Sequence, residues 1–392
     1  MLQHGAINLY RQFTMSINSH ENTKAERLLG SIKNRNLQII AEKVIKGVPV
    51  NESDALAMLT TKDILELGSI AHYLKTKLHG DAVYYSVNIN LNYTNICELR
   101  CPLCAFSRSE DDADAFTLSL DEIETRVRNA VSSGVDEVHI VGGLNPRLTI
   151  EYFLEMLQRI KSIRPDIFIV AFTAVEYDYF ARINCLPLDE VFIMMKEAGL
   201  GALPGGGAEV FAPEIRNVIA PKKISGKRWL DVMRTAHGLE LKTNATLLYN
   251  HLEKPADIAD HLLQIRALQE ETGGFKTFVP LTYHGINTNI RSQRPETTGF
   301  GDIRLYATSR IVLNNVPHLK ALWMYLGEKM AQILLNFGVD DLGGTYHHER
   351  IVHAAGASTP ESGSEPHLRR LIKLSGFVPI RAAANYETRQ MQ

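Results

Sequence analysis

Strand-like and helix-like segments alternate through most of this chain, and this alternation limits the folds it can adopt. Tyr84–Leu91 alternates apolar and polar side chains, as a half-buried strand does. Further strand-like segments lie at residues 137–141, 167–173, 200–203, 242–249, 275–280, 320–325 and 339–342. Helical periodicity marks the stretches between them, at 120–133, 150–164, 188–198, 226–237, 255–272, 302–314 and 327–337. Eight strands in roughly 250 residues predict an α/β fold, a TIM-type (β/α) barrel. A doubly wound open sheet is the alternative, since periodicity does not reveal closure.

The alternating region is flanked by two segments of different character. Residues 1–80 are expected to form an N-terminal helical extension, in which Asn51 or Ser53 caps one helix. Residues 81–345 make the predicted barrel. Residues 346–392 are expected to form a C-terminal loop followed by a helix around 367–374. Met15 is an alternative natural start of the chain.

Charge and hydropathy exclude several classes of function. The chain has 42 Lys and Arg against 44 Asp and Glu, whereas a protein that mainly grips nucleic acid or an anionic membrane needs a cationic surface. The longest apolar runs, such as Ile167–Phe172, are far shorter than a membrane span, and the N-terminus has no signal-peptide core. We therefore expect a cytoplasmic protein with no nucleic-acid or membrane partner.

Three of the four cysteines, Cys97, Cys101 and Cys104, lie within eight residues. Disulfides across so few residues would be strained, so a reduced, metal-binding loop is the better interpretation. The loop follows the first predicted strand, where a barrel carries its active site. Three thiolates suit a 4Fe-4S cluster with one open iron, because no fourth cysteine is near. The alternative, a zinc site, would need a fourth ligand such as a distant histidine. Cys185 is interpreted as a small buried apolar residue.

The spacing C-x3-C-x2-C, closely followed by the aromatic Phe106, resembles that of the radical S-adenosylmethionine (SAM) enzymes. The resemblance implies that the three cysteines bind the cluster, that SAM chelates the open iron, and that reductive cleavage of SAM yields a 5'-deoxyadenosyl radical. It also implies an electron donor such as flavodoxin or ferredoxin. By the same resemblance Phe106, Gly142, Gly143 and Glu176 are cofactor contacts, the glycines at the methionine amino group and the carboxylate at the ribose. From the residues alone, a glycine pair is also a common turn, and Glu176 is equally well a solvated residue at a helix start.

Further motifs resemble the branch of this family that serves menaquinone and deazaflavin synthesis. They are Leu203–Glu209, Ile219–Lys223, Asn244–Tyr249, Glu270–Phe275 and Asp341–Thr345. Within the branch, His251–Glu253, Pro280–His284 and His347–Gly356 are most similar to aminofutalosine synthase. Asn250, in place of the usual glycine, and Gly285-Ile286 depart from that pattern and bear on the substrate fit.

The resemblance implies a specific reaction. The adenosyl radical adds to the enol-ether double bond of 3-[(1-carboxyvinyl)oxy]benzoate, an aryl group migrates, and a carboxylate leaves as carbon dioxide or bicarbonate. The products are 6-amino-6-deoxyfutalosine and methionine, on the futalosine route to menaquinone. SAM is then a consumed co-substrate.

A small aromatic dicarboxylate of this kind needs hydrogen-bond donors and apolar walls around it. The catalytic candidates are Asn244, His251 and His284; for the two histidines a structural role explains the sequence equally well. The substrate-binding candidates are Gly205, Gly206, Gly207, Glu209 and Arg216. Lys222 and Lys223 are interpreted as a solvated pair, and His139 as a core histidine.

Two other interpretations stay open. The cyclase of dehypoxanthine futalosine and the tyrosine-using subunit of the deazaflavin (FO) synthase make the same radical but abstract hydrogen from other substrates. A non-enzymatic iron-sulfur or zinc protein is the third possibility. A chain of barrel length argues against it, because a simple electron carrier needs far fewer residues.

Overall fold

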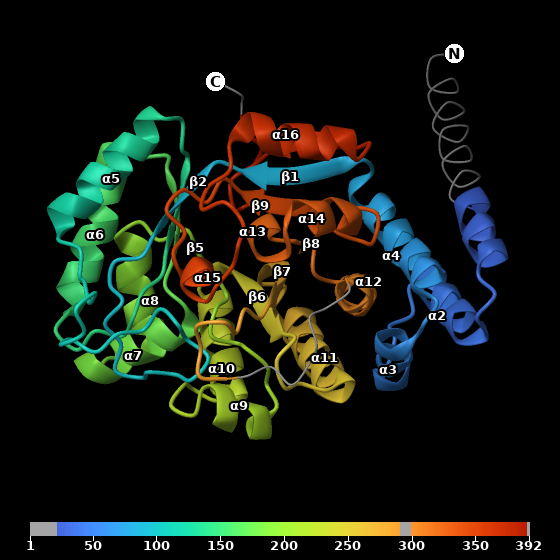
Figure 1. The fold of residues 1–392 in the computed structure, drawn as a ribbon, viewed down its shortest axis with the longest axis horizontal. Coiled ribbons are helices and arrows are strands. Elements are labelled where there is room, and N and C mark those ends of the chain that lie inside the picture. The colour runs from blue at the N-terminus through green and yellow to red at the C-terminus, as the bar shows by residue number, and fades with distance from the viewer. Residues whose placement is uncertain (1–21, 291–298, 390–392) are drawn as a thin grey trace, which may run out of the picture.

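The computed structural model describes residues 22–290 and 299–389, and its centre is a curled, seven-stranded parallel sheet (Figure 1). The strands follow one another in chain order, each paired in parallel with the next. They are β2 (Asn88–Leu91), β3 (Glu137–Ile140), β4 (Phe168–Ala171), β5 (Ala202–Leu203), β6 (Lys242–Tyr249), β7 (Phe275–Thr282) and β8 (His318–Leu319). This is the order of a (β/α) barrel, not that of a doubly wound sheet.

A second, three-stranded sheet lies beside the first and closes the ring. It consists of β1 (Ala82–Ser86) between β10 (Val378–Arg381) and β9 (Asp341–Gly344). The segment at 340–347 bonds to both ends of the larger sheet: Ala321 N–H donates to Asp341 O at 2.8 Å, and Asn90 N–H donates to His347 O at 2.8 Å. The predicted TIM-type barrel is therefore confirmed, with this segment in the place of the eighth strand.

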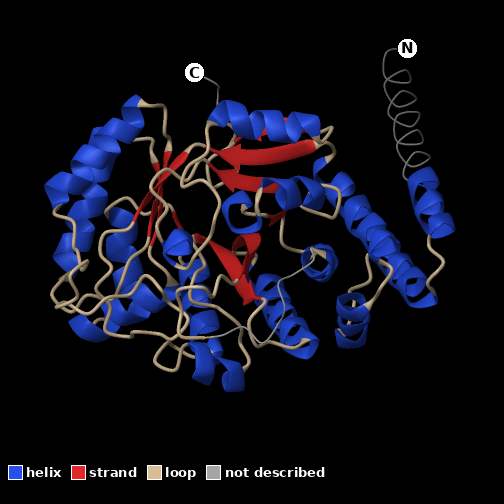
Figure 2. Cartoon of the chain, viewed as in Figure 1, coloured by secondary structure: helices blue, strands red, loops and turns tan. Residues whose placement is uncertain are grey.

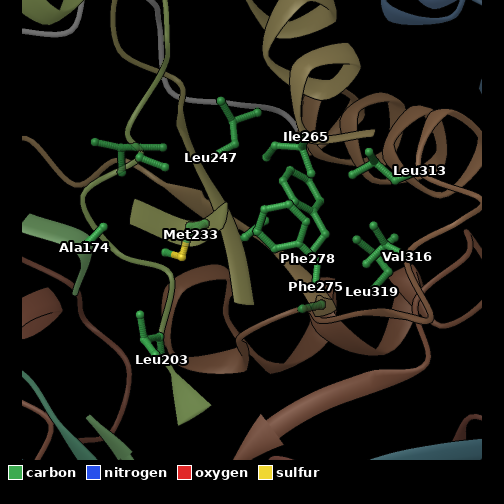
Figure 3. Close-up of a cluster of buried hydrophobic side chains, with 14 of the residues drawn as sticks. Ala174, Leu203, Met233, Leu247, Ile265, Phe275, Phe278, Leu313, Val316 and Leu319 are labelled. Atoms are coloured by element: carbon green, nitrogen blue, oxygen red, sulfur yellow. The ribbon is translucent and has the colours of Figure 1, made fainter. Parts of the chain in front are cut away.

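Helices cover the outside of the barrel (Figure 2). The long ones are α5 (Leu120–Ser132), α6 (Ile150–Ile163), α7 (Ala174–Asn184), α8 (Leu188–Glu197), α10 (Gly226–Gly238), α11 (Pro255–Thr272), α12 (Phe300–Val312) and α16 (Glu365–Leu374). The short ones are α9 (Pro213–Ile219), α13 (Trp323–Leu326), α14 (Glu328–Leu334) and α15 (Ile351–Ala354). Figure 3 shows apolar side chains such as Leu247, Phe275, Phe278 and Ile265 filling the layer between strands and helices.

Three helices precede the barrel: α2 (Arg35–Lys46), α3 (Glu52–Thr60) and α4 (Ile64–His79). Asn51 caps α3 as expected, in a capping box with Asp54. Helix α4 packs on α12 and α3 packs on α11, so this extension covers one side of the barrel. The C-terminal segment supplies β10 as well as the expected helix. None of the described helices is long and apolar enough to cross a membrane.

Two predicted strands differ from the structure. The segment at 84–91 is interrupted at Val87, because β1 pairs within the small sheet while β2 begins the large one. The prediction for 320–325 is wrong: the strand is His318–Leu319, and Trp323 starts the short helix α13. The Trp323 indole is buried and donates to Gly344 O at 2.9 Å, so an apolar run with a strand-like pattern forms a short helix here.

Candidate active site

A cavity of about 350 Å³ lies at the carboxyl ends of the barrel strands. Loops that follow β2 to β5 form one end of it, and side chains of the strands themselves form the deeper end. Apolar side chains make most of the wall. The polar ones are Asn90, Asn95, Ser107, His139, Thr173, Glu176, Glu209, Lys223, Asn244, Thr246, Lys320 and Glu349.

Cys97, Cys101 and Cys104 all line this cavity. Backbone bonds hold their loop: Cys97 N–H donates to Arg108 O at 3.0 Å, and Cys104 N–H donates to Cys101 O at 2.9 Å. All three thiols are free, with Cys101 buried and the other two half-buried. Burial raises the pKa of Cys101 to about 11, against the opposing effect of Lys223. Metal binding at this thiol therefore displaces a proton.

The spread of the thiols favours a cluster over a single zinc ion. Tetrahedral zinc with Zn–S bonds near 2.3 Å brings its sulfur ligands to about 3.8 Å from one another. In the described part of the chain the three cysteine sulfur atoms are farther apart than this, because they do not all lie within 4.8 Å of one another. Phe106 lines the cavity beside the loop, edge-on to Phe116. The donor set thus fits an iron-sulfur cluster with three protein ligands. The prediction for Cys185 is wrong, since this residue is exposed at the end of α7.

The glycine pair after β3 lies against the cysteine loop. Gly143 N–H donates to Thr94 O at 3.0 Å. A Cβ on Gly143 would collide with the carbonyl oxygen of Ile96, and one on Gly142 would lie 2.6 Å from the ring of Tyr93. Close packing of the loop on β3 therefore requires glycine at both positions. Both glycines line the cavity, and their contact with SAM stays a prediction.

Glu176 is buried, at 2% exposure, so the alternative of a solvated residue is wrong. Its Oε1 accepts from Tyr93 Oη at 2.8 Å and from Gly142 N–H at 3.1 Å, and its Oε2 accepts from Thr173 N–H at 2.6 Å. The last bond belongs to the capping box that begins α7. Glu176 therefore joins the start of α7 to the glycine pair, and it faces the cavity where a ribose contact is predicted.

Glu209 pairs with Lys223, whose Nζ lies 2.5 Å from Oε1 of the carboxylate. Both side chains line the cavity beside Gly206 and Gly207. Although burial opposes it, Lys223 lowers the pKa of Glu209. The interpretation of a solvated lysine pair is thus wrong for Lys223, while Lys222 is exposed.

Two predicted substrate contacts lie outside the cavity lining. Gly205 has a φ of 81° and packs against the backbone of Asn244, which leaves no room for a side chain. Arg216 is buried and donates to the backbone carbonyls of Gly207, Ala208, Val210 and Ile224. This arginine holds the loop after β5 in shape, and a direct substrate contact stays a prediction.

Of the three catalytic candidates, only Asn244 lines the cavity. Asn244, on β6, lines the cavity. His251 is buried with both ring nitrogens on backbone groups: Nε2 lies 2.9 Å from Leu248 O, and Nδ1 accepts from the next N–H at 2.7 Å. His284 Nε2 lies 3.0 Å from Tyr325 O. Neither histidine lines the cavity, whereas Tyr325 does, so His284 contacts the cavity wall through Tyr325.

The sequence interpretation missed a charged group at the deep end of the cavity. Lys320 lines the cavity with its Nζ 3.2 Å from Asp341. His139, read as a core residue, also faces the cavity and lies 2.6 Å from the buried Glu137. Lys276 on β7 is 6% exposed. Burial and Lys320 lower the pKa of Lys276 to about 7, against the opposing charges of Glu137 and Asp341. The sequence does contain a signal for this site, because Lys276 is a lysine inside an otherwise apolar strand.

Comparison with known proteins identifies the family. A model of the radical SAM superfamily matches residues 91–265, and a model of the CofH/MqnC C-terminal region matches residues 272–392. An aminodeoxyfutalosine synthase of Thermus thermophilus is 38% identical over 91% of this chain and 96% of its own length. The chain belongs to the radical SAM superfamily. It is a radical SAM enzyme, and the family's 4Fe-4S cluster and SAM are its cofactors.

Other relatives of similar identity carry two different names. An aminodeoxyfutalosine synthase of Streptomyces coelicolor is 34% identical and covers 89% of this chain and 92% of its own. A 5-amino-6-(D-ribitylamino)uracil–L-tyrosine 4-hydroxyphenyl transferase of Methanopyrus kandleri is 37% identical, over 86% of this chain and 93% of its own length. Among solved structures, methylornithine synthase (PylB) superposes with a TM-score of 0.70 at 14% identity, covering 87% of this chain and 97% of that one. That likeness shows the shared barrel fold.

Proposed function

We propose that this chain catalyses the aminofutalosine synthase reaction. It transfers the 5'-deoxyadenosyl group of SAM to 3-[(1-carboxyvinyl)oxy]benzoate, with rearrangement and loss of a carboxylate, to give 6-amino-6-deoxyfutalosine and methionine. The reaction would serve menaquinone synthesis in the cytoplasm, with a low-potential donor such as flavodoxin or ferredoxin as the electron source.

The observation that carries this choice is the charge at the deep end of the cavity. Lys320 lines it, and Lys276 lies buried just behind it. The carboxylates that line the cavity are each held by donors of the chain: Glu209 by Lys223, Glu176 by Thr173 and its neighbours, and Glu349 by backbone N–H groups. The ring carboxylate of an aromatic dicarboxylate would meet two lysines here, whose charge Glu137 and Asp341 offset only in part, whereas tyrosine has a single carboxylate that its own ammonium group offsets.

The residues of this chain divide the work between two ends of the cavity. At one end Cys97, Cys101 and Cys104 would hold the cluster, which together with SAM supplies the adenosyl radical. Gly142 and Glu176 would bind the methionine and ribose parts of SAM beside that loop. Apolar side chains between the two ends enclose the aromatic ring and exclude water from the reacting atoms.

The test is one anaerobic incubation of the reconstituted protein with SAM, a strong reductant and the enol-ether benzoate, analysed by mass spectrometry. Aminofutalosine among the products supports the proposal. If SAM is cleaved to 5'-deoxyadenosine and methionine without aminofutalosine, the radical chemistry stands and this substrate is refuted.

A parallel incubation with tyrosine and 5-amino-6-(D-ribitylamino)uracil tests the second candidate. The similarity to the Methanopyrus kandleri relative, at 37% identity, favours including it. A coupled product from these two compounds, with none from the benzoate, would assign the chain to that reaction.

A further inference from the structure

Three polar side chains on neighbouring strands meet at the deep end of the cavity. They are Asn244 on β6, Lys276 on β7 and Lys320 directly after β8. The pairing of β6 with β7 shifts register between Thr243 and Asn244, so that Lys276 is the extra residue of a β-bulge. Bulges next to active sites re-aim a side chain. Here the bulge brings the Lys276 ammonium group to Asn244 inside the barrel.

This contact fixes which way the Asn244 amide points. Lys276 Nζ donates to Asn244 Oδ1. An ammonium group carries only donors, so the amide oxygen must face it and the amide nitrogen must point away from it. Because Asn244 lines the cavity, its Nδ2 is the group available to donate to a ligand there.

Lys320 supplies a second donor on the other side of β7. Its Nζ lies 3.2 Å from Asp341 Oδ2, and the same oxygen accepts from Tyr386 Oη at 2.7 Å. Gly343 N–H donates to the other carboxylate oxygen at 2.6 Å. Asp341 thus has two hydrogen-bond donors besides its ion pair with Lys320, and that pair does not use all three N–H groups of the lysine.

Lys276 itself has no carboxylate within 4.0 Å among the described residues, although it is 6% exposed. Glu137 and Asp341 act on its charge only from farther away, and a buried cation without a close anion is costly for the fold. An anion bound between Asn244 and Lys320 would compensate that charge.

We propose that Asn244 and Lys320 form a carboxylate subsite, with Lys276 as the positioning residue behind it. Resting on the proposed function, this subsite takes the ring carboxylate of the aromatic dicarboxylate. Asn244 is the third of eight residues of β6, deep in the barrel, whereas the cysteine loop follows the carboxyl end of β2. The enol ether must face the cysteine loop to react, which leaves the ring carboxylate at the deep end.

Paired substrates give the sharpest test. 2-Phenoxyacrylate differs from the enol-ether benzoate only by the missing ring carboxylate. We expect wild-type protein to bind it 10- to 100-fold more weakly, the loss of one or two charge-assisted hydrogen bonds. The variant Asn244→Asp keeps the bond to Lys276 but presents a carboxylate to the cavity. It should bind the benzoate at least 10-fold more weakly than wild type while binding 2-phenoxyacrylate nearly as well. Lys320→Gln should likewise lose most of the preference for the benzoate.

The exposed Lys329→Gln on α14 is the matched control and should keep the full preference. Binding is measured by equilibrium dialysis with cluster-loaded protein and SAM but no reductant, so the result does not depend on turnover. Equal affinity of wild-type protein for both compounds would overturn the subsite, and so would a preference that survives both substitutions. A protein that prefers the benzoate but forms no aminofutalosine would keep the subsite and refute the proposed reaction.

Discussion

Replacing Gly143 by alanine tests whether a close approach of two backbones holds the cysteine loop. A Cβ on residue 143 would lie less than 3.0 Å from the carbonyl oxygen of Ile96, beside Cys97, whereas ordinary contacts begin at 3.4 Å. The obstacle is backbone and cannot rotate aside. The loop must therefore recede by roughly 1 Å, which also weakens the 3.0 Å hydrogen bond from Gly143 to Thr94.

The size of the effect follows from this displacement. Overpacking of a well-packed site costs about 1–3 kcal/mol of unfolding free energy, which a domain of this size tolerates. A displacement of about 1 Å in a positioned group costs on the order of 100-fold in rate. We expect Gly143→Ala to stay folded, to bind less iron per chain after anaerobic reconstitution, and to form 5'-deoxyadenosine about 100-fold more slowly.

Gly238→Ala is the control, because a Cβ at this exposed end of α10 meets nothing within 4 Å. It should keep the iron content and the rate, and gain up to about 1 kcal/mol in stability. Iron content and rate equal to those of wild type in Gly143→Ala would refute the close-approach argument.

Further predictions concern the cluster, the cavity wall and the buried lysine. Cys101→Ala should abolish both iron-dependent absorbance and SAM cleavage, and retained cleavage would remove this thiol from the cluster. His284→Ala frees the backbone of Tyr325 and should uncouple SAM cleavage from product formation, measured as the ratio of 5'-deoxyadenosine to aminofutalosine; an unchanged ratio would contradict it. Burial and Lys320 lower the pKa of Lys276 to about 7, and a bound anion raises it, so KM for the dicarboxylate should rise by up to about tenfold per pH unit above pH 7. Lys276→Met should flatten that profile. It should also raise the unfolding temperature at pH 6. There the buried wild-type lysine is charged, which destabilises the folded state, and this cost disappears only above the pKa of the lysine in the unfolded chain.

Much of the barrel could be predicted because its strands obey simple patterns. Segments such as Ile167–Thr173 and Lys242–Tyr249 are apolar runs of strand length between amphipathic helices. The last part of the ring could not be predicted in the same way. Trp323 and its neighbours form an apolar run as well, yet they fold as a helix whose indole binds the Gly344 carbonyl, a tertiary contact that the local pattern does not reveal.

The cysteine loop was predictable from spacing alone, since its chemistry is local. Glu176 was not, because its burial depends on Tyr93 and Gly142, which are far from it in the sequence. Arg216 shows the converse. An arginine after a glycine-rich stretch suggests an anion site, yet the guanidinium donates its hydrogen bonds to backbone carbonyls around it.

The deep end of the cavity depends on a feature that no alternation pattern reveals. In a regular strand paired without interruption, Lys276 and Thr277 would face opposite sides of the sheet. The bulge in β7 breaks that rule: Asn244 pairs with Thr277, and the extra residue Lys276 nonetheless reaches the Asn244 amide. A chain without this extra residue would have a regular strand and no buried lysine at this point. Stability alone would therefore not retain the bulge. Recognition of an anion inside the barrel is a reason to keep both the bulge and the lysine.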